Sequence, residues 1–284
     1  MASTSLTSTT AAGANPTITS AEVIEFREAN LGFSGTVSTK YTDDGVGVTK
    51  RWMPITLPNS GAARSKSEGN DTSITFDVST ETDVSLTINQ WYYSAFDLEE
   101  FENSLSIVDL QGEYTKAAAY VVNLAVDDAL AALPDNFSQT VGTLITPLAD
   151  ADIRRAIQYL EDADVPMNED VFFAMSPATK SGLLGIDRYA SSDFNRGGGA
   201  NIVTGEFGDI YGLRCWQSTN VEGTNGAGHD NAIYHRDAMA LAWRVKPMTQ
   251  NFDDIDTLSH QTAIQTIFGV VEVRDDHGVW AKGA

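Results

Sequence analysis

SLSIVDLQGEYTKAAAYVVNLAVDDALAAL, residues 104 to 133, is the segment that decides the fold. Its apolar side chains recur every three or four residues, which is the period of one face of an α-helix. Pro134 ends the pattern, since proline disfavours helical geometry in the residue before it. At about 1.5 Å per residue the predicted helix is about 45 Å long, more than twice the length of an average helix. We therefore expect a flat, extended subunit across which this rod lies.

Two features inside the rod each have two interpretations. Gly112 is unfavourable in a helix by about 1 kcal/mol relative to alanine, and it marks either close packing against a neighbouring segment or a point where the rod can bend. Asp127 and Asp128 lie near the carboxyl end, where the helix dipole favours cations. The pair either meets a basic group of another segment or subunit, or remains solvated.

The chain before the rod divides into three parts. Residues 2–17 are dominated by Ser, Thr, Ala and Gly and predict a flexible arm, and a capping-box pattern at Thr19 predicts a short helix through Ala29. Residues 36–93 alternate with period two on both sides of a polar tip at 59–71, which predicts a long β-hairpin. An isolated ribbon is marginal in water, so its apolar face should pack on something else, which in a self-assembling protein is a neighbouring copy.

The chain after the rod predicts a mixed α/β unit. The expected helices are Pro147–Ala163 and Pro177–Leu184, the second capped by Ser176. The expected strands are Asp170–Met175, an alternating segment from Ile210 to Trp216, pieces within Asn231–Val245, Thr262–Val273 and Gly278–Lys282. The expected loops are 187–200, 222–230 and an acidic loop at Asn251–Asp256. The fold class predicted is α+β.

Composition excludes several classes of protein. The net charge of −21 argues against a free-standing nucleic-acid binder; it serves solubility, or it keeps a surface that faces packaged DNA from adhering to it. Cys215 is the single cysteine, so no intrachain disulfide can form. The amino terminus lacks the pattern of a secretory signal, and no apolar run reaches 18 residues, so we expect no membrane span.

Motifs for chemistry are weak throughout the chain. Gly197–Gly199 does not open a helix after a strand, and Lys180–Ser181 lacks the glycines of a phosphate loop. The four histidines, His229, His235, His260 and His277, do not have the spacing of a helical zinc pair, so ordinary hydrogen-bonded roles are expected. Asp253, Asp254 and Asp256 lack the glycine and distal glutamate of a calcium loop. We therefore predict no catalytic residue, no cofactor and no metal site.

The order of these segments resembles that of the major capsid proteins of tailed bacteriophages, which have the Hong Kong 97-type capsid fold. Four local sequences agree with this resemblance: VSLTINQWYYSAFDLEEFENSL (84–105), DVFFAMSP (170–177), GEFGDIYGLRCWQSTNV (205–221) and FGVVEV (268–273). The first resembles the family's passage from the hairpin into an acidic helix start, and the last its return strand. The likeness covers roughly residues 18 to 284.

The resemblance implies a division into an N-terminal arm (1–35), an E-loop hairpin (36–93), a P-domain with the spine helix (94–144), an A-domain (145–242) and return strands of the P-domain (243–284). It implies pentamers and hexamers that close into an icosahedral shell around double-stranded DNA, without sequence-specific binding and without a membrane. Expected partners are a scaffolding protein that is separate or already removed, a portal and a decoration or cement protein. The expected location is the virion, after assembly in the host bacterial cytoplasm.

Some members of the family crosslink a hairpin lysine to an asparagine of a neighbour. Lys66 and Asn70 lie in the tip, but no motif activates either residue, so we expect no crosslink. The nearest rival is an encapsulin, a cellular compartment with the same fold. A hydrolase or nucleotide-binding enzyme would need a polar cluster for which the sequence gives no support, and a tail or decoration protein would have no use for the spine.

Overall fold

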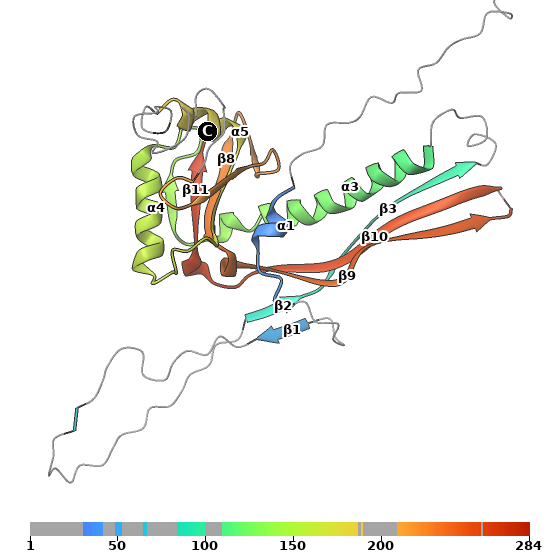
Figure 1. The fold of residues 1–284 in the computed structure, drawn as a ribbon, viewed down its shortest axis with the longest axis horizontal. Coiled ribbons are helices and arrows are strands. Elements are labelled where there is room, and N and C mark those ends of the chain that lie inside the picture. The colour runs from blue at the N-terminus through green and yellow to red at the C-terminus, as the bar shows by residue number, and fades with distance from the viewer. Residues whose placement is uncertain are drawn as a thin grey trace, which may run out of the picture.

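The computed structural model describes residues 31–41, 49–52, 65–66, 84–99, 110–186, 189, 209–256 and 258–284. The helix expected from Thr19 to Ala29, the first residues of the rod, most of the hairpin and the glycine-rich loop lie outside these residues. The described chain forms two bodies that lie side by side, which we call the plate and the lobe (Figure 1).

The plate consists of a three-stranded antiparallel sheet and one long helix that lies along it (Figure 1). The strand order is β3–β10–β9, and the elements are β3 (Gln90–Glu99), β9 (Met239–Asp254), β10 (Ser259–Glu272) and α3 (Leu110–Ala131). Ala118 and Val122 of α3 pack on Ile264 of β10, which closes one face of the sheet. The plate is therefore a two-layer structure.

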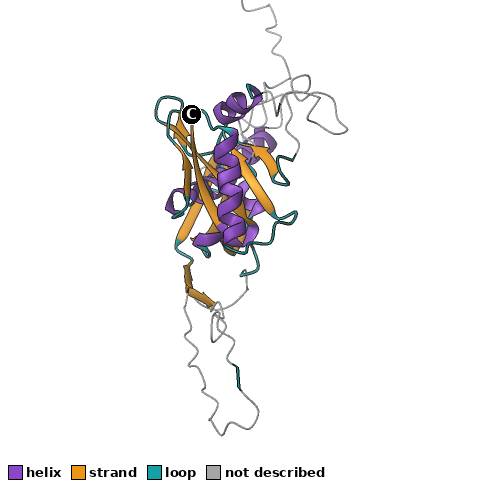
Figure 2. Ribbon diagram, turned by 90° about the vertical axis from the view of Figure 1, so that its left-hand side faces the viewer, coloured by secondary structure: helices purple, strands orange, loops and turns teal. Residues whose placement is uncertain are grey.

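The lobe is a six-stranded mixed sheet between two layers of helices. Its main order is β4–β11–β8–β5–β6, with β7 paired to β8. The elements are β4 (Thr140–Gly142), α4 (Asp150–Asp162), β5 (Val171–Met175), α5 (Pro177–Leu184), β6 (Arg214–Gln217), β7 (Gly223–Thr224), β8 (Gly228–His235) and β11 (Gly278–Gly283). Figure 2, which looks from the lobe end, shows a helix in front of these strands.

The two faces of the lobe sheet bury different partners. On one face Ile153 and Leu160 of α4 pack against Phe173. On the other face Leu130, near the end of α3, packs against Tyr234. The spine helix thus supports both bodies, first under the plate sheet and then under the lobe sheet.

The remaining elements lie where the plate meets the lobe. They are α1 (Phe33–Thr36), the antiparallel pair β1 (Thr49–Trp52) and β2 (Val84–Thr87), and the 3-10 turns η1 (Pro134–Asn136), η2 (Arg236–Ala238) and η3 (Asp275–His277). The chain passes from lobe to plate through η2 and returns through η3. Two connections therefore join the bodies in addition to α3.

The rod prediction is confirmed within the described residues, with different bounds. α3 has 22 residues and ends at Ala131, and the chain then turns through η1, which begins at Pro134. Together with that turn, residues Gln111–Asn136 are long and apolar enough to cross a membrane by length and composition, which the sequence analysis did not expect of any segment. Val122, Val126 and Leu130 are buried against the two sheets, so protein packing accounts for part of this apolar composition, although only 39% of the apolar window is buried within the subunit.

The lobe helices and several strands were also predicted correctly. α4 and β5 lie within their expected ranges, and α5 has the expected bounds. Ser176 caps α5, because its side chain accepts a hydrogen bond from the backbone N–H of Thr179 at 3.1 Å. The last two strands match β10 and β11.

The strand β3 runs to Glu99, because ten of its residues pair with β10. Several expectations were wrong. Residues Asn251–Asp254 end β9 rather than forming a loop, and 222–230 form the β7–β8 hairpin. The alternating segment at Ile210 begins with a tight turn, in which Tyr211 and Gly212 have φ of 52° and 85°. Pairing with Leu213 closes this turn.

Strand pairing crosses the expected domain boundaries, which stay predictions. Residues 278–283, expected to return to the P-domain, form β11 between β4 and β8 in the lobe sheet. β4 at 140–142 joins the same sheet. β3 crosses the boundary expected at 93, and β9 crosses the one expected at 242. Backbone pairing, which cannot be read from local pattern, decides these memberships.

Candidate functional site

The second face of the plate sheet carries large exposed apolar side chains. Trp91 and Tyr93 of β3 are 66% and 72% exposed, and Met248 and Phe252 of β9 are 42% and 68% exposed. Successive side chains of a strand point to opposite faces, and Leu98, of opposite parity in β3, is buried. We define the outer plate face as the side opposite α3, formed by Trp91, Tyr93, Ala95, Met248, Phe252 and Ala263.

A hollow of 680 Å³ lies on this face. Ala95 of β3, Ala263 of β10 and Gln250 of β9 are register partners across its floor. Phe252 lines one side of the hollow. Trp91 is held in place by a hydrogen bond from its Nε1 to Oε1 of Gln265 at 3.1 Å. The face therefore combines a depression with ordered aromatic side chains beside it, a shape that suits an apolar partner.

The same face is already covered at the end near the lobe. There Leu86 and Ile88, in β2 and just after it, pack on Ala240 and Ala242 of β9. A Cβ atom added to Gly269 of β10 would lie 2.4 Å from the carbonyl oxygen of Thr87. Residues 86–88 thus cross the sheet directly over Gly269, where there is no room for a larger residue.

The far end of the plate is the β9–β10 turn, which is apolar and strained. Ile255 and Leu258 are 84% and 65% exposed. Leu258 has φ of 52°, a left-handed conformation that is unfavourable for a residue with a Cβ atom. Beside the turn, Nδ1 of His260 lies 2.6 Å from Oδ1 of Asp253. This contact ties the two strands where the sheet ends.

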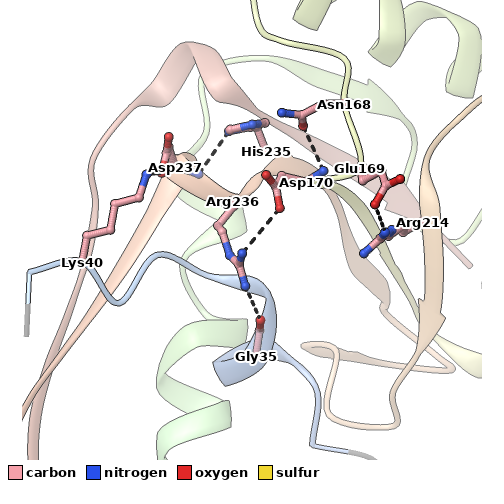
Figure 3. A network of polar contacts seen from close by, with 9 residues as sticks. All are labelled: Gly35, Lys40, Asn168, Glu169, Asp170, Arg214, His235, Arg236 and Asp237. Carbon is pink, nitrogen blue, oxygen red and sulfur yellow. Dashed lines mark hydrogen bonds and ion pairs between the residues drawn. The ribbon is translucent and has the colours of Figure 1, made fainter.

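At the junction, a polar network joins the N-terminal segment to both bodies (Figure 3). Arg236 of η2 donates to the carbonyl of Gly35 at 3.2 Å and pairs with Asp170 at 3.4 Å. Lys40 pairs with Asp237 at 3.0 Å. Burial raises the pKa of Asp237, but the hydrogen bond and charge of Lys40 outweigh this effect and lower it. The network therefore holds residues 35–40 against η2.

A second charged group at the junction is a pair of carboxyls. Glu272, at the end of β10, lies beside Asp275 of η3, whose carboxylate accepts hydrogen bonds from the backbone N–H and the hydroxyl of Ser138. Burial, then the charge of Asp275 and a hydrogen bond between the two carboxyls, raise the pKa of Glu272 to about 7. Glu272 therefore keeps its proton at pH values where an ordinary glutamate has lost it.

The two aspartates of the rod have different environments, and neither expected interpretation fits Asp127. Its carboxylate is 1% exposed and accepts a hydrogen bond from the N–H of Phe33 at 2.9 Å and from Nδ2 of Asn220 at 3.2 Å. Asp128 is exposed. Gly112 lies in the described part of α3, and both interpretations of it remain open.

The other residues singled out from the sequence have ordinary surroundings where they are described. His235, buried at 6% exposure, accepts a hydrogen bond from the N–H of Asp237 at 3.2 Å, and burial lowers its pKa. Burial raises the pKa of the Cys215 thiol to about 12. Lys66 is exposed, whereas Asn70 and Gly197–Gly199 lie outside the described residues. Among the described residues no group of three or more His, Cys, Asp or Glu side chains is placed to hold a metal ion.

Sequence reasoning missed the outer plate face. The signal was present in QWYYSAFDLE, where aromatic residues occupy alternate and adjacent positions just after the hairpin. The spacing of apolar residues along a strand does not show which face of the sheet is covered, because that depends on where α3 packs. The pairing of β10 with the distant strand β3 was needed to place Met248 and Phe252 of β9 on the same face as Trp91.

Comparisons with known proteins agree on one family. A family model described as phage capsid protein matches residues 44–278. No curated protein sequence matches the chain. Similar solved structures include a chain of Mycobacterium phage Che8, with 20% identity, a TM-score of 0.78 and coverage of 94% of this chain and 96% of that one. The capsid of Cyanophage P-SCSP1u has 13% identity and a TM-score of 0.77, with coverage of 95% of this chain and 93% of that one. The mature capsid of bacteriophage PhiM1 has 16% identity and a TM-score of 0.74, with coverage of 94% of this chain and 91% of that one.

Proposed function

The chain belongs to the phage capsid protein family and has the Hong Kong 97-type capsid fold, and from this premise we propose how it builds its shell. It is a major capsid protein of a tailed bacteriophage, a structural component of the virion that assembles with copies of itself. The proposal is that pentamers and hexamers close into an icosahedral shell around double-stranded DNA. In this proposal the shell forms through contacts between subunits, and the protein catalyses no reaction.

The outer plate face is the observation that supports this mechanism. Exposed apolar patches larger than a few hundred Å² are rare on monomeric proteins and mark interaction sites. At its lobe end this face already binds an extended segment of its own chain, through Leu86 and Ile88. We infer that an extended segment of a neighbouring copy covers the remainder, over Trp91, Tyr93 and Phe252.

The division of labour follows from this inference. Residues 1–35 serve as the N-terminal arm, and residues 36–93 as the E-loop hairpin that reaches the neighbour. The plate serves as the P-domain, and the lobe serves as the A-domain that gathers around the capsomer axes. Pairing assigns β4 and β11 to the lobe, so the functional units are discontinuous in sequence.

The remaining partners follow from the same proposal. A scaffolding protein, a portal and a decoration or cement protein act with the shell, which assembles in the host bacterial cytoplasm. DNA is enclosed without sequence-specific binding, and the net charge of −21 suits a wall that must not adhere to its contents. The family match is to phage capsid proteins and does not favour the encapsulin alternative.

Electron microscopy of the purified full chain tests the function. Closed shells of one diameter are expected, and a preparation that contains only monomers at high concentration would contradict the proposal. Deleting residues 59–71, or the first 20 residues, should impair assembly more than it destabilises the lobe. Normal shells from both truncated chains would show that the division of labour is wrong.

A further inference from the structure

Asp127 joins three parts of the chain with one side chain. It belongs to α3, its Oδ1 accepts the N–H of Phe33 in the N-terminal segment, and its Oδ2 accepts Nδ2 of Asn220 in the lobe. A second backbone N–H, that of Ser34, also contributes to its environment. The carboxylate is buried at the seam where plate, lobe and arm meet. Loss of this acceptor would leave buried donors without a partner, which is costly.

The segment around Phe33 is enclosed by the lobe. A Cβ atom added to Gly32 would lie 2.5 Å from the ring of Trp216, and the ring of Phe33 packs edge-on against that of Trp216 with centroids 4.7 Å apart. The hydroxyls of Thr36 and Tyr234 are hydrogen-bonded at 2.6 Å. Close contacts at Gly32, Phe33 and Thr36, in and beside one short helix, indicate a specific fit rather than incidental contact.

The same segment is also fixed to the plate. Ser38 forms a parallel bridge with Ala240, in which its N–H donates to the carbonyl of Met239 at 3.1 Å and its carbonyl accepts from Leu241 at 3.0 Å. Residues 32–41, which we call the clasp, therefore contact lobe, spine and plate within ten positions. A rigid connection of this kind fixes the angle between the bodies that it touches.

We propose that Asp127 is the positioning residue of this clasp, and that the lobe keeps one orientation relative to the plate only while the clasp is closed. The consequence for assembly rests on the proposed function. A closed shell of one size requires the same curvature from equivalent subunits, and a variable angle between lobe and plate would remove that uniformity. The proposed N-terminal arm leads directly into the clasp. Contacts between this arm and neighbouring subunits therefore act on the angle between lobe and plate.

The charge on Asp127 gives the clasp a defined pH dependence. Burial raises the pKa of Asp127, and the hydrogen bonds from Asn220 and the two backbone N–H groups oppose this effect only in part. The titratable groups that face it are Asp128 of its own helix and Tyr234 of β8. A carboxyl whose pKa is higher in the closed state binds its proton more tightly there. The clasp should therefore be tightest at acid pH and loosen as pH rises from the ordinary value of 3.8 through the raised pKa.

Amide hydrogen exchange of residues 31–41 in full-length subunits tests the clasp. Asp127→Ala should speed exchange of this peptide about ten- to hundredfold, since two or more buried donors lose their acceptor. Asp127→Asn can still accept from Phe33, and Asn220 can turn its amide to offer an oxygen. This variant should therefore exchange at least as slowly as wild type at pH 7. The ratio of wild-type to Asp127→Asn exchange should rise with pH, whereas Asp128→Ala, which removes no acceptor from the clasp, should not speed exchange.

Two results would overturn the proposal. The first is unchanged exchange of residues 31–41 in Asp127→Ala, which would refute the clasp whether or not shells form. The second is equal acceleration in Asp127→Ala and Asp127→Asn, together with faster exchange of β5, because that pattern means general unfolding. Electron microscopy gives the assembly readout: mixed diameters for Asp127→Ala support the inference, and shells of wild-type diameter contradict its consequence. Failure of the wild-type chain to form shells would instead refute the proposed function.

Discussion

The lobe sheet is covered on both faces, by α4 on one side and by α1 and the end of α3 on the other. The plate sheet is covered by α3 on one face, while most of the other face is exposed in the single subunit. The apolar side chains of the lobe are thus used for folding, and those of the outer plate face remain for assembly. Stability and assembly should therefore respond to mutations in different regions.

The largest effect on stability is expected in the lobe core. Phe173 of β5 has no exposed surface and packs between α4 and the sheet. Phe173→Ala should lower the free energy of unfolding by about 3–5 kcal/mol, because it removes a buried ring and leaves a cavity. Denaturant unfolding of isolated subunits measures this loss. The matched control is Phe252→Ala in the plate, and an equal loss there would remove the distinction between the regions.

The reverse effect is expected from the outer plate face. Replacing Trp91 and Tyr93 together by serine should change unfolding by less than about 1 kcal/mol, since both side chains are largely exposed. Assembly, followed by light scattering and microscopy, should be lost or reduced at least tenfold in yield. Met167→Ser, at a partly exposed apolar residue of the lobe, is the control and should assemble normally. Full assembly of the double variant would show that this face is not an interface.

A smaller effect is expected from Glu272 at the junction of the two bodies. Its pKa of about 7 in the folded chain lies above its ordinary 4.5, so folding is weakened as pH rises from 4.5 through 7. Glu272→Gln should remove this dependence and raise the free energy of unfolding at pH 8 by about 1 kcal/mol. The gain is small because Glu272 is partly exposed and solvent screens its charge. Thermal unfolding at pH 5 and pH 8 measures the difference. Equal gains at both pH values would contradict the assigned cause.

The smallest change concerns the spine helix that the two bodies share. Gly112→Ala should stabilise α3 by up to about 1 kcal/mol if the added methyl group fits. The resemblance implies that spine helices of this family bend as shells mature and expand. Unchanged assembly and expansion of Gly112→Ala shells would argue against a bend at this position and for simple packing. Shells that form but fail to expand would support a hinge within the plate. Thermal unfolding and microscopy before and after expansion distinguish these cases.

Local signals predicted much of the lobe and little of the plate. The Ser176 cap, the proline at position 177 and the unbroken apolar run of β5 are encoded by adjacent residues, so α5 was predicted with its bounds and β5 within its expected range. The exposed face of Trp91 and Phe252 depends on pairing between strands that lie more than 150 positions apart. Asp127 was misjudged for the same reason, because its donors come from residues 33 and 220. Local pattern specifies an element, and only tertiary pairing specifies which of its faces is free.

The position of β11 has a consequence for the timing of synthesis. This strand is made after every other strand of the lobe sheet, yet it lies between β4 and β8 and pairs with both. A nascent chain on the ribosome therefore cannot complete the lobe until residue 283 has left the exit tunnel. Translation order thus delays completion of the lobe sheet until its last strand has emerged from the ribosome.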